Sequence, residues 1–124
     1  MLFRSDDEIQ KMTFGWQVAR FVRSNAIVFA DTGATVGIGA GQMSRVDSVE
    51  LAIRKAREAG LDIAGCALAS DGFFPFPDSI EIAHEAGIRA VIQPGGSIRD
   101  SKVTDRANEL GMTMAMTGQR HFKH

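Results

Sequence analysis

The second half of the chain alternates short apolar runs with segments of helical period. The apolar runs fall at residues 64–70, 89–93 and 112–117, and segments with apolar residues every three or four positions separate them at 78–86 and 100–110. A strand, a crossover helix and a second strand in this order form a right-handed unit that builds a parallel sheet. The alternation therefore predicts an α/β fold with a mostly parallel sheet, whose last strand, 112–117, is buried.

The first half predicts a helix, a hairpin and a second helix. Apolar residues recur at helical spacing over residues 9–22. Two short apolar runs, 25–30 and 35–39, flank the turn sequence Asp31-Thr32-Gly33, so we expect a hairpin at the antiparallel edge of the sheet. Ser44 then offers an N-cap for a helix that runs to Ala59.

Composition limits the class of protein. The 124 residues, 44% hydrophobic and 23% charged, suffice for one domain, residues 1–124, and are too few for two. A net charge of −1 gives no basic excess for nucleic acid or an anionic membrane. No apolar run reaches the roughly 20 residues of a membrane span, and the first eight residues lack the apolar core of a signal peptide. These features predict a cytoplasmic domain with no nucleic-acid or membrane partner.

Three loops follow predicted strands, where ligands bind in open parallel sheets. Gly37-x-Gly39-x-Gly41 either brings backbone N–H groups to a ligand or packs a helix tightly on the sheet. Pro94-Gly95-Gly96-Ser97 either cradles an anion beside Arg99 or forms a tight turn. Phe73-Phe74-Pro75-Phe76 favours stacking on a flat ring, and the alternative is that its phenyl rings close the core or a dimer contact. Spacing alone thus predicts a small α/β domain that binds a planar, anionic ligand.

The reactive side chains do not indicate zinc or a nucleophile. One cysteine, without a Cys-x-x-Cys or His-x-Glu partner set, cannot supply a standard zinc site. Cys66 lies in a predicted buried strand, so we expect it in the core. His84 lies among acidic residues of a predicted helix, and His121 and His124 lie in the polar tail.

Five motifs, in order, resemble the C-terminal portion of the AICAR transformylase/IMP cyclohydrolase family of purine biosynthesis. They are Ser-Asn-Ala-Ile-Val at 24–28, Val-Gly-Ile-Gly-Ala-Gly-Gln-Met-Ser-Arg-Val at 36–46, Ala-Ser-Asp-Gly-Phe-Phe-Pro-Phe-Pro-Asp at 69–78, Ile-Gln-Pro-Gly-Gly-Ser-Ile-Arg-Asp at 92–100, and Thr-Gly-Gln-Arg-His-Phe-Lys-His at 117–124. The resemblance implies a three-layer αβα, cytidine-deaminase-like fold with a mixed sheet and no zinc. It also implies part of a phosphoribosylaminoimidazolecarboxamide formyltransferase, which moves a formyl group from 10-formyltetrahydrofolate to the nucleotide AICAR.

The resemblance further implies roles for single residues. Asn25 is similar to the family's catalytic asparagine, which orients the carboxamide and formyl groups. Positions on the nucleotide side match Phe73, Arg120, Phe122 and His124. Positions on the folate side match Arg45, Val46, Pro75, Phe76 and Asp78, where Asp78 would hydrogen-bond the pterin. Ser24 and Asp71 resemble positions around a monovalent cation such as K⁺.

One part of the family's machinery has no counterpart here. The general base belongs to a Lys-His pair in an upstream subdomain, and the only Lys-His dipeptide of this chain, Lys123-His124, answers to a different motif. General-base catalysis contributes roughly 10²- to 10⁴-fold, so we expect the chain to be nearly inert alone. The resemblance thus implies a homodimer or a complex with a chain that carries the upstream subdomain, and no cyclohydrolase domain. The alternative is a non-catalytic module or scaffold that binds a purine nucleotide or folate.

Overall fold

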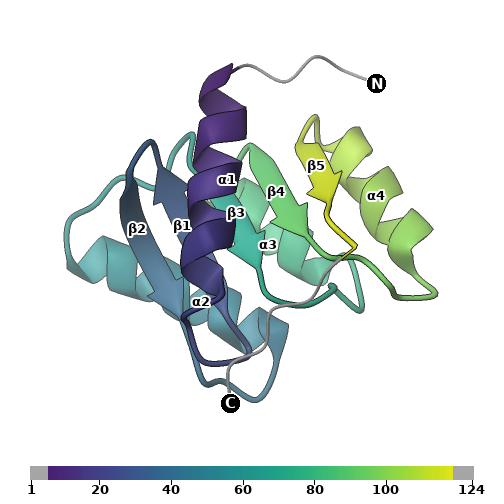
Figure 1. Cartoon of the computed structure of the whole chain (residues 1–124), viewed down its shortest axis with the longest axis horizontal. Coiled ribbons are helices and arrows are strands. Elements are labelled where there is room, and N and C mark those ends of the chain that lie inside the picture. Colours follow the sequence, from purple (N-terminus) through teal and green to yellow (C-terminus); the bar gives the residue numbers. More distant parts are fainter. Residues whose placement is uncertain (1–5, 119–124) are drawn as a thin grey trace.

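The computed structural model describes residues 6–118, which form helices and strands in alternation after an N-terminal helix and a hairpin (Figure 1). The elements are α1 (Asp6–Ala19), β1 (Ile27–Asp31), β2 (Ala34–Gly39), α2 (Arg45–Glu58), β3 (Ala67–Ser70), α3 (Asp78–Glu85), β4 (Ala90–Gln93), α4 (Asp100–Glu109) and β5 (Thr113–Met116). Each predicted helix and strand is present, and most bounds differ from the prediction by one to three residues. Among residues 6–118, none of the helices has the length and apolar character of a membrane span.

The sheet is mixed, with strand order β2-β1-β3-β4-β5. β1 pairs antiparallel with both β2 and β3, whereas β3, β4 and β5 run parallel. The predicted antiparallel edge hairpin is therefore confirmed. The prediction that the last strand is buried is wrong, because β5 forms the opposite edge: its residues are half-buried and Met116 is 44% exposed.

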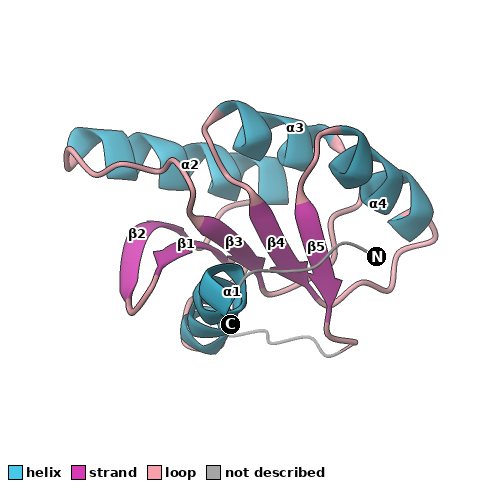
Figure 2. Cartoon of the chain, turned by 90° about the horizontal axis from the view of Figure 1, so that it is seen from above, coloured by secondary structure: helices cyan, strands magenta, loops and turns pink. Residues whose placement is uncertain are grey.

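The layers follow from two apolar faces of the sheet. Helices α2, α3 and α4 cover one face and α1 covers part of the other, so the three-layer αβα arrangement is confirmed (Figure 2). The larger core contains Phe29, Leu68 and Phe74 between the sheet and α2–α4. The smaller core contains Met12, Val28 and Ala69 beneath α1.

Helix α2 begins where the sequence predicts. The Ser44 hydroxyl oxygen accepts a hydrogen bond from the backbone N–H of Asp47 at 3.1 Å, which is the N-cap interaction. Lys55 and Arg57 lie in the last turn, where cations interact favourably with the helix dipole. The apolar face, with Val49 and Ala52, packs into the larger core.

Two glycines of the predicted ligand loop lie instead within β2, directly under α2. A Cβ added to Gly39 would lie 1.9 Å from the carbonyl oxygen of Ser48, and one added to Gly37 would lie 2.5 Å from the carbonyl oxygen of Ala52. Their role is therefore to let the helix backbone lie close against the strand, and the interpretation of these two residues as a ligand-binding turn is wrong. Gly41, with φ +67°, belongs to the loop that leads to α2.

Candidate functional site

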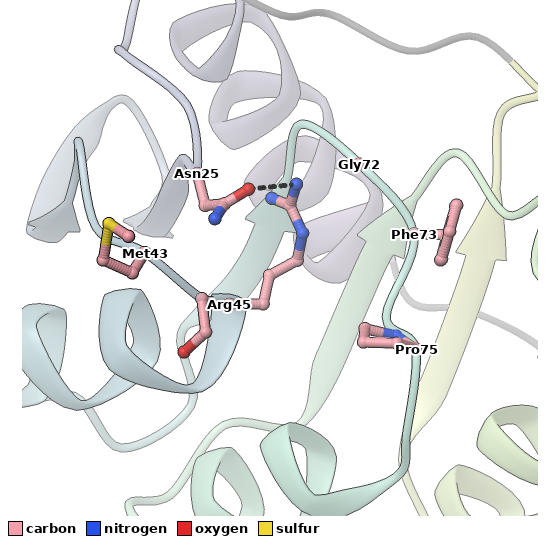
Figure 3. Close-up of a pocket in the computed structure, with 7 residues that line it drawn as sticks. Asn25, Met43, Arg45, Gly72, Phe73 and Pro75 are labelled. Carbon is pink, nitrogen blue, oxygen red and sulfur yellow. Dashed lines mark hydrogen bonds between the residues drawn. The ribbon is translucent and has the colours of Figure 1, made fainter.

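A pocket of about 450 Å³ opens at the end of the sheet where β3 finishes and β1 begins. Because β1 is antiparallel to its neighbours, its first residues meet the loops that follow β2 and β3. Three separate segments line the pocket, as Figure 3 shows. The lining residues are Asn25, Met43, Ser44, Arg45, Gly72, Phe73 and Pro75. Four of them, Asn25, Arg45, Phe73 and Pro75, were singled out from three different sequence motifs.

The side-chain amide of Asn25 is held on both sides. Its Oδ1 accepts a hydrogen bond from Nη2 of Arg45 at 2.8 Å (Figure 3). Its Nδ2 donates to the carbonyl oxygen of Gln42 at 3.1 Å. The backbone carbonyl of Asn25 also accepts from the Ser48 hydroxyl at 2.5 Å. Asn25 is thus fixed in orientation before any ligand arrives.

The guanidinium of Arg45 turns inward and forms a buried ion pair with Asp71. Nη1 of Arg45 donates to Oδ1 of Asp71 and, at 3.3 Å, to the Ser70 hydroxyl. The side chain of Asp71 is completely buried, and that of Arg45 is 9% exposed. Oδ1 of Asp71 also accepts from the backbone N–H of Ala26 at 3.1 Å. Arg45, expected on the folate side, therefore lines the pocket while its charged end contacts protein groups.

The aromatic loop after β3 is divided between the core and the surface. Phe74 is fully buried, so the core-closing alternative holds for this ring. Its backbone N–H donates to Oε1 of the buried Gln93 at 3.2 Å, which fixes the loop. Phe73 is half-buried in the pocket wall. Phe76 is 50% exposed, with the guanidinium of Arg99 4.8 Å from its ring centroid.

In the loop at residues 94–100, backbone N–H groups are hydrogen-bonded to the side chain of Asp100. The backbone N–H groups of Gly96 and Ser97 donate to the side-chain oxygens of Asp100 at 2.8 and 3.1 Å. Gly95 and Gly96 have φ values of +73° and +108°, which suit glycine. Because Asp100 already occupies the N–H groups, the tight-turn alternative describes this loop, and the expected anion cradle is not available there.

The other predicted residues lie away from the pocket or outside the described residues. Val46 is half-buried on α2, and Asp78 is an exposed residue at the start of α3 whose Oδ1 accepts from the N–H of Ser79. His84 is on α3. Arg120, Phe122 and His124 lie outside residues 6–118.

Titratable groups that could do acid–base or nucleophilic work are scarce at the pocket. Among the described lining residues none is a histidine, a lysine or a carboxylate. The buried Cys66 precedes β3, and burial raises the pKa of its thiol, so it stays protonated near neutral pH. Arg45 and Asn25 supply hydrogen bonds and charge but take no proton from a substrate.

Two buried oxygen atoms lie at the positions where the resemblance implies a monovalent cation. Ser24 Oγ and Asp71 Oδ2 are buried and have no hydrogen-bond partner among the described residues. A hydroxyl and a carboxylate already paired with Arg45 suit a monovalent cation better than a divalent one, which prefers several charged oxygens. Within residues 6–118 no group of three or more His, Cys, Asp or Glu side chains could hold a metal ion.

One residue that lines the pocket, and one residue that fixes the loop beside it, were not predicted from the sequence. Met43, which is 95% exposed, lines the pocket. Its position two residues before Arg45 was the available signal. Gln93 is a buried polar residue at the end of the apolar run Ala-Val-Ile, and such a residue needs a partner, which here is the backbone of Phe74.

Comparison with protein families and curated relatives matches the chain to one segment of longer proteins. The family model of the AICARFT/IMPCHase bienzyme matches residues 3–55. The "Bifunctional purine biosynthesis protein PurH" of two Neisseria gonorrhoeae strains, NCCP11945 and ATCC 700825 / FA 1090, is 55% identical over 120 residues. These residues are 97% of this chain and 23% of each relative, so the chain spans under a quarter of their length.

Solved structures show the same fold at low sequence identity. A Thermotoga maritima diaminohydroxyphosphoribosylaminopyrimidine deaminase/5-amino-6-(5-phosphoribosylamino)uracil reductase matches with a TM-score of 0.60, 18% identity, and coverage of 88% of this chain and 36% of that protein. The apo dCMP deaminase of cyanophage S-TIM5 matches with a TM-score of 0.60, 14% identity, and coverage of 93% and 100%. The fold is therefore cytidine-deaminase-like.

Proposed function

We propose that this chain forms part of a folate-dependent formyltransferase. The premise is that the chain is homologous to one segment of the bifunctional purine biosynthesis proteins of the AICARFT/IMPCHase type. The substrates would be 10-formyltetrahydrofolate and AICAR, in the synthesis of IMP, in the cytoplasm. In the transfer, the 5-amino nitrogen attacks the formyl carbon, the bond from that carbon to N10 of the folate breaks, and the amine proton passes through a base to N10.

The observation that carries this proposal is the convergence of separate motifs on one pocket. Asn25, Arg45, Phe73 and Pro75 come from three segments that the fold brings together. Phe73 offers a ring face for a planar base, and Asn25 offers a fixed amide for a carboxamide or a formyl oxygen. The exposed Phe76, with Arg99 over its ring, would offer the folate an apolar and cationic surface.

The general base is proposed to come from elsewhere. The described pocket offers no histidine or lysine, and Asp71 is buried in an ion pair. A segment absent from this chain, in a partner polypeptide or a longer form of the protein, would supply the Lys-His pair. A homodimer could add further contacts, but two copies of this chain would still lack that pair.

The same feature supports a second candidate function. A pocket with hydrogen-bonding and stacking groups and no base is also what a non-catalytic module for a purine nucleotide or folate requires. Such a module would bind the nucleotide and never transfer the formyl group.

Reconstitution distinguishes the two candidates. The purified chain is mixed with the remaining segment of a bifunctional purine biosynthesis relative, and conversion of AICAR is followed by the absorbance change of the folate. We expect no transfer by either part alone and transfer by the mixture. Nucleotide binding in calorimetry without transfer in any mixture would favour the binding module.

Asn25→Ala tests the role of the amide in that mixture. We expect loss of transfer by about 10²-fold or more, the range of a positioned polar group at a reacting centre, with most nucleotide affinity retained. Glu81→Gln on α3, outside the pocket, is the matched control. Full activity of the Asn25 variant would contradict the assignment.

A further inference from the structure

We infer that the buried Arg45–Asp71 pair is a positioning device for the Asn25 amide, and that Arg45 acts through Asn25 without contacting a ligand through its guanidinium. The part of this inference that concerns reaction rate rests on the proposed function. The part that concerns geometry rests only on the described contacts.

The place of Arg45 in the chain is unfavourable for the helix that it begins. Arg45 is the first residue of α2, where the helix dipole is positive and an acidic side chain would be stabilising. Within residues 6–118 its charge is compensated by one carboxylate, that of the completely buried Asp71. A residue that breaks a local rule and needs a buried partner to do so is typical of a functional site.

The shape of the guanidinium links two groups rigidly. Nη1 is fixed by Asp71 and by the Ser70 hydroxyl at 3.3 Å, and Nη2 contacts Asn25 Oδ1 at 2.8 Å. Because the guanidinium is planar, fixing one nitrogen fixes the direction of the other. A lysine at position 45 would carry the same charge but could not hold both partners at these angles.

Asp71 acts on Asn25 by two routes. Its Oδ1 holds the guanidinium that contacts the amide, and it also accepts from the backbone N–H of Ala26, the next residue in the chain. The buried carboxylate of Asp71 therefore positions both the main chain next to Asn25 and, through Arg45, the Asn25 side chain.

The Asn25 amide is thus fixed in orientation while part of its hydrogen-bonding capacity stays available. Arg45 takes one lone pair of Oδ1, and Gln42 takes one N–H of Nδ2. Among the contacts of the described residues, one acceptor site of Oδ1 and one N–H of Nδ2 then remain for a ligand. Since an amide flip would place Nδ2 against the guanidinium, two donors facing each other, Arg45 also selects which end of the amide faces which way.

The geometry is tested by NMR on the ¹⁵N-labelled chain. We expect the two side-chain N–H signals of Asn25 to be well separated and slow to exchange, and to collapse toward the positions of an exposed asparagine in Arg45→Lys and Asp71→Asn. Arg106→Lys, in the exposed pair with Glu81, is the matched control and should leave them unchanged. Unchanged Asn25 signals in a folded Arg45→Lys chain would overturn the inference.

The consequence for rate is tested by a double-mutant cycle in the reconstituted mixture. We expect Arg45→Lys to lower kcat about tenfold or more, with KM for each substrate within about twofold, because the group acts on the transition state through Asn25. In the Asn25→Ala background the same change should have almost no effect, since residues that act as one unit are not additive. Additive effects, or a raised folate KM, would show that Arg45 contacts the ligand directly and overturn the inference. If the wild-type mixture shows no transfer, the proposed function fails, while the NMR result still decides the positioning role.

Discussion

The first turn of α2 and the middle of the same helix are held to the sheet by opposite means. At the first turn, a buried charge reaches across to Asp71 and Asn25. About one and two turns later, at Ser48 and Ala52, the helix backbone lies directly on the glycines of β2, with no side chain between them. The close backbone contact determines how near α2 lies to the strand, and so where Arg45 enters the pocket. The seam formed by Gly37 and Gly39 therefore supports the polar site without being part of it.

Among the changes that test the two regions, removal of the Asp71 carboxylate should cause the largest loss in the free energy of unfolding. In Asp71→Ala the guanidinium of Arg45 loses its charge partner, and breaking a buried pair costs about 3–5 kcal/mol. Urea unfolding followed by circular dichroism measures the loss. Asp71→Asn, which keeps an oxygen near the N–H of Ala26, should lose less. Equal, small losses in both variants would mean that Arg45 turns out to solvent and that the charge does not hold the first turn.

Addition of one carbon atom to a glycine of the seam should cause the next largest loss in the free energy of unfolding. In Gly39→Ala the new methyl would overlap the Ser48 carbonyl oxygen, so the helix must move, at a cost of about 3 kcal/mol. Gly37→Ala, with its nearest atom at 2.5 Å, should cost less in the same urea experiment.

Gly15→Ala is the matched control for the seam. Its new carbon would meet the methyl groups of Ala69 and Ala30 at 3.1 and 3.2 Å and the Val28 carbonyl oxygen at 4.0 Å, so these methyl groups must shift by a few tenths of an ångström. Alanine favours the helix by about 1 kcal/mol, which offsets the cost of that shift. We expect its midpoint to stay near that of the wild type. A loss in Gly39→Ala no greater than in Gly15→Ala would contradict the packing role of the seam.

These two regions also show where sequence reasoning succeeds and where it stops. The apolar pattern predicts every helix and strand, because a helix buried on one face shows a helical period, and central strands buried on both faces, such as β3 and β4, show continuous apolar runs. The glycine motif is ambiguous by nature: a missing side chain indicates that something comes close, and the sequence does not say whether it is a ligand or a helix. The strand order, which makes β5 an edge, depends on long-range pairing that no local pattern encodes.

The site was predictable in position and not in orientation. Asn25, Arg45 and Phe73 follow or precede strands, and the fold brings such positions to one end of the sheet. That Arg45 turns inward depends on the buried Asp71, which is 26 residues away in the chain. In contrast, the filling of the 94–100 loop by Asp100 is a local interaction, and the Ser97-x-x-Asp100 spacing could have indicated it.

The cap of α2 offers a smaller test of the first turn. Ser44→Ala removes the hydrogen bond to the N–H of Asp47 and should cost about 1 kcal/mol in the urea experiment. Because the Arg45 contacts do not pass through the Ser44 hydroxyl, the Asn25 NMR signals should stay separated. Their collapse in this variant would mean that the cap, as well as Asp71, sets the direction of Arg45. Ser44→Asp, which restores an acceptor at the cap, is the control.

Loss of the exposed ion pair between α3 and α4 should cause the smallest loss of stability, and it serves as a reference for the loss of the buried pair. Arg106 and Glu81 contact each other at 2.8 Å, yet their side chains are 37% and 44% exposed. Water and salt screen such a pair, and at about 1 M salt the Debye length falls to about 3 Å. We therefore expect Glu81→Gln to leave the urea midpoint unchanged at high salt, whereas the loss in Asp71→Ala should persist, since salt does not reach a buried carboxylate. If salt removed both losses alike, the Arg45–Asp71 pair would be accessible to solvent, and Asn25 would have no fixed partner.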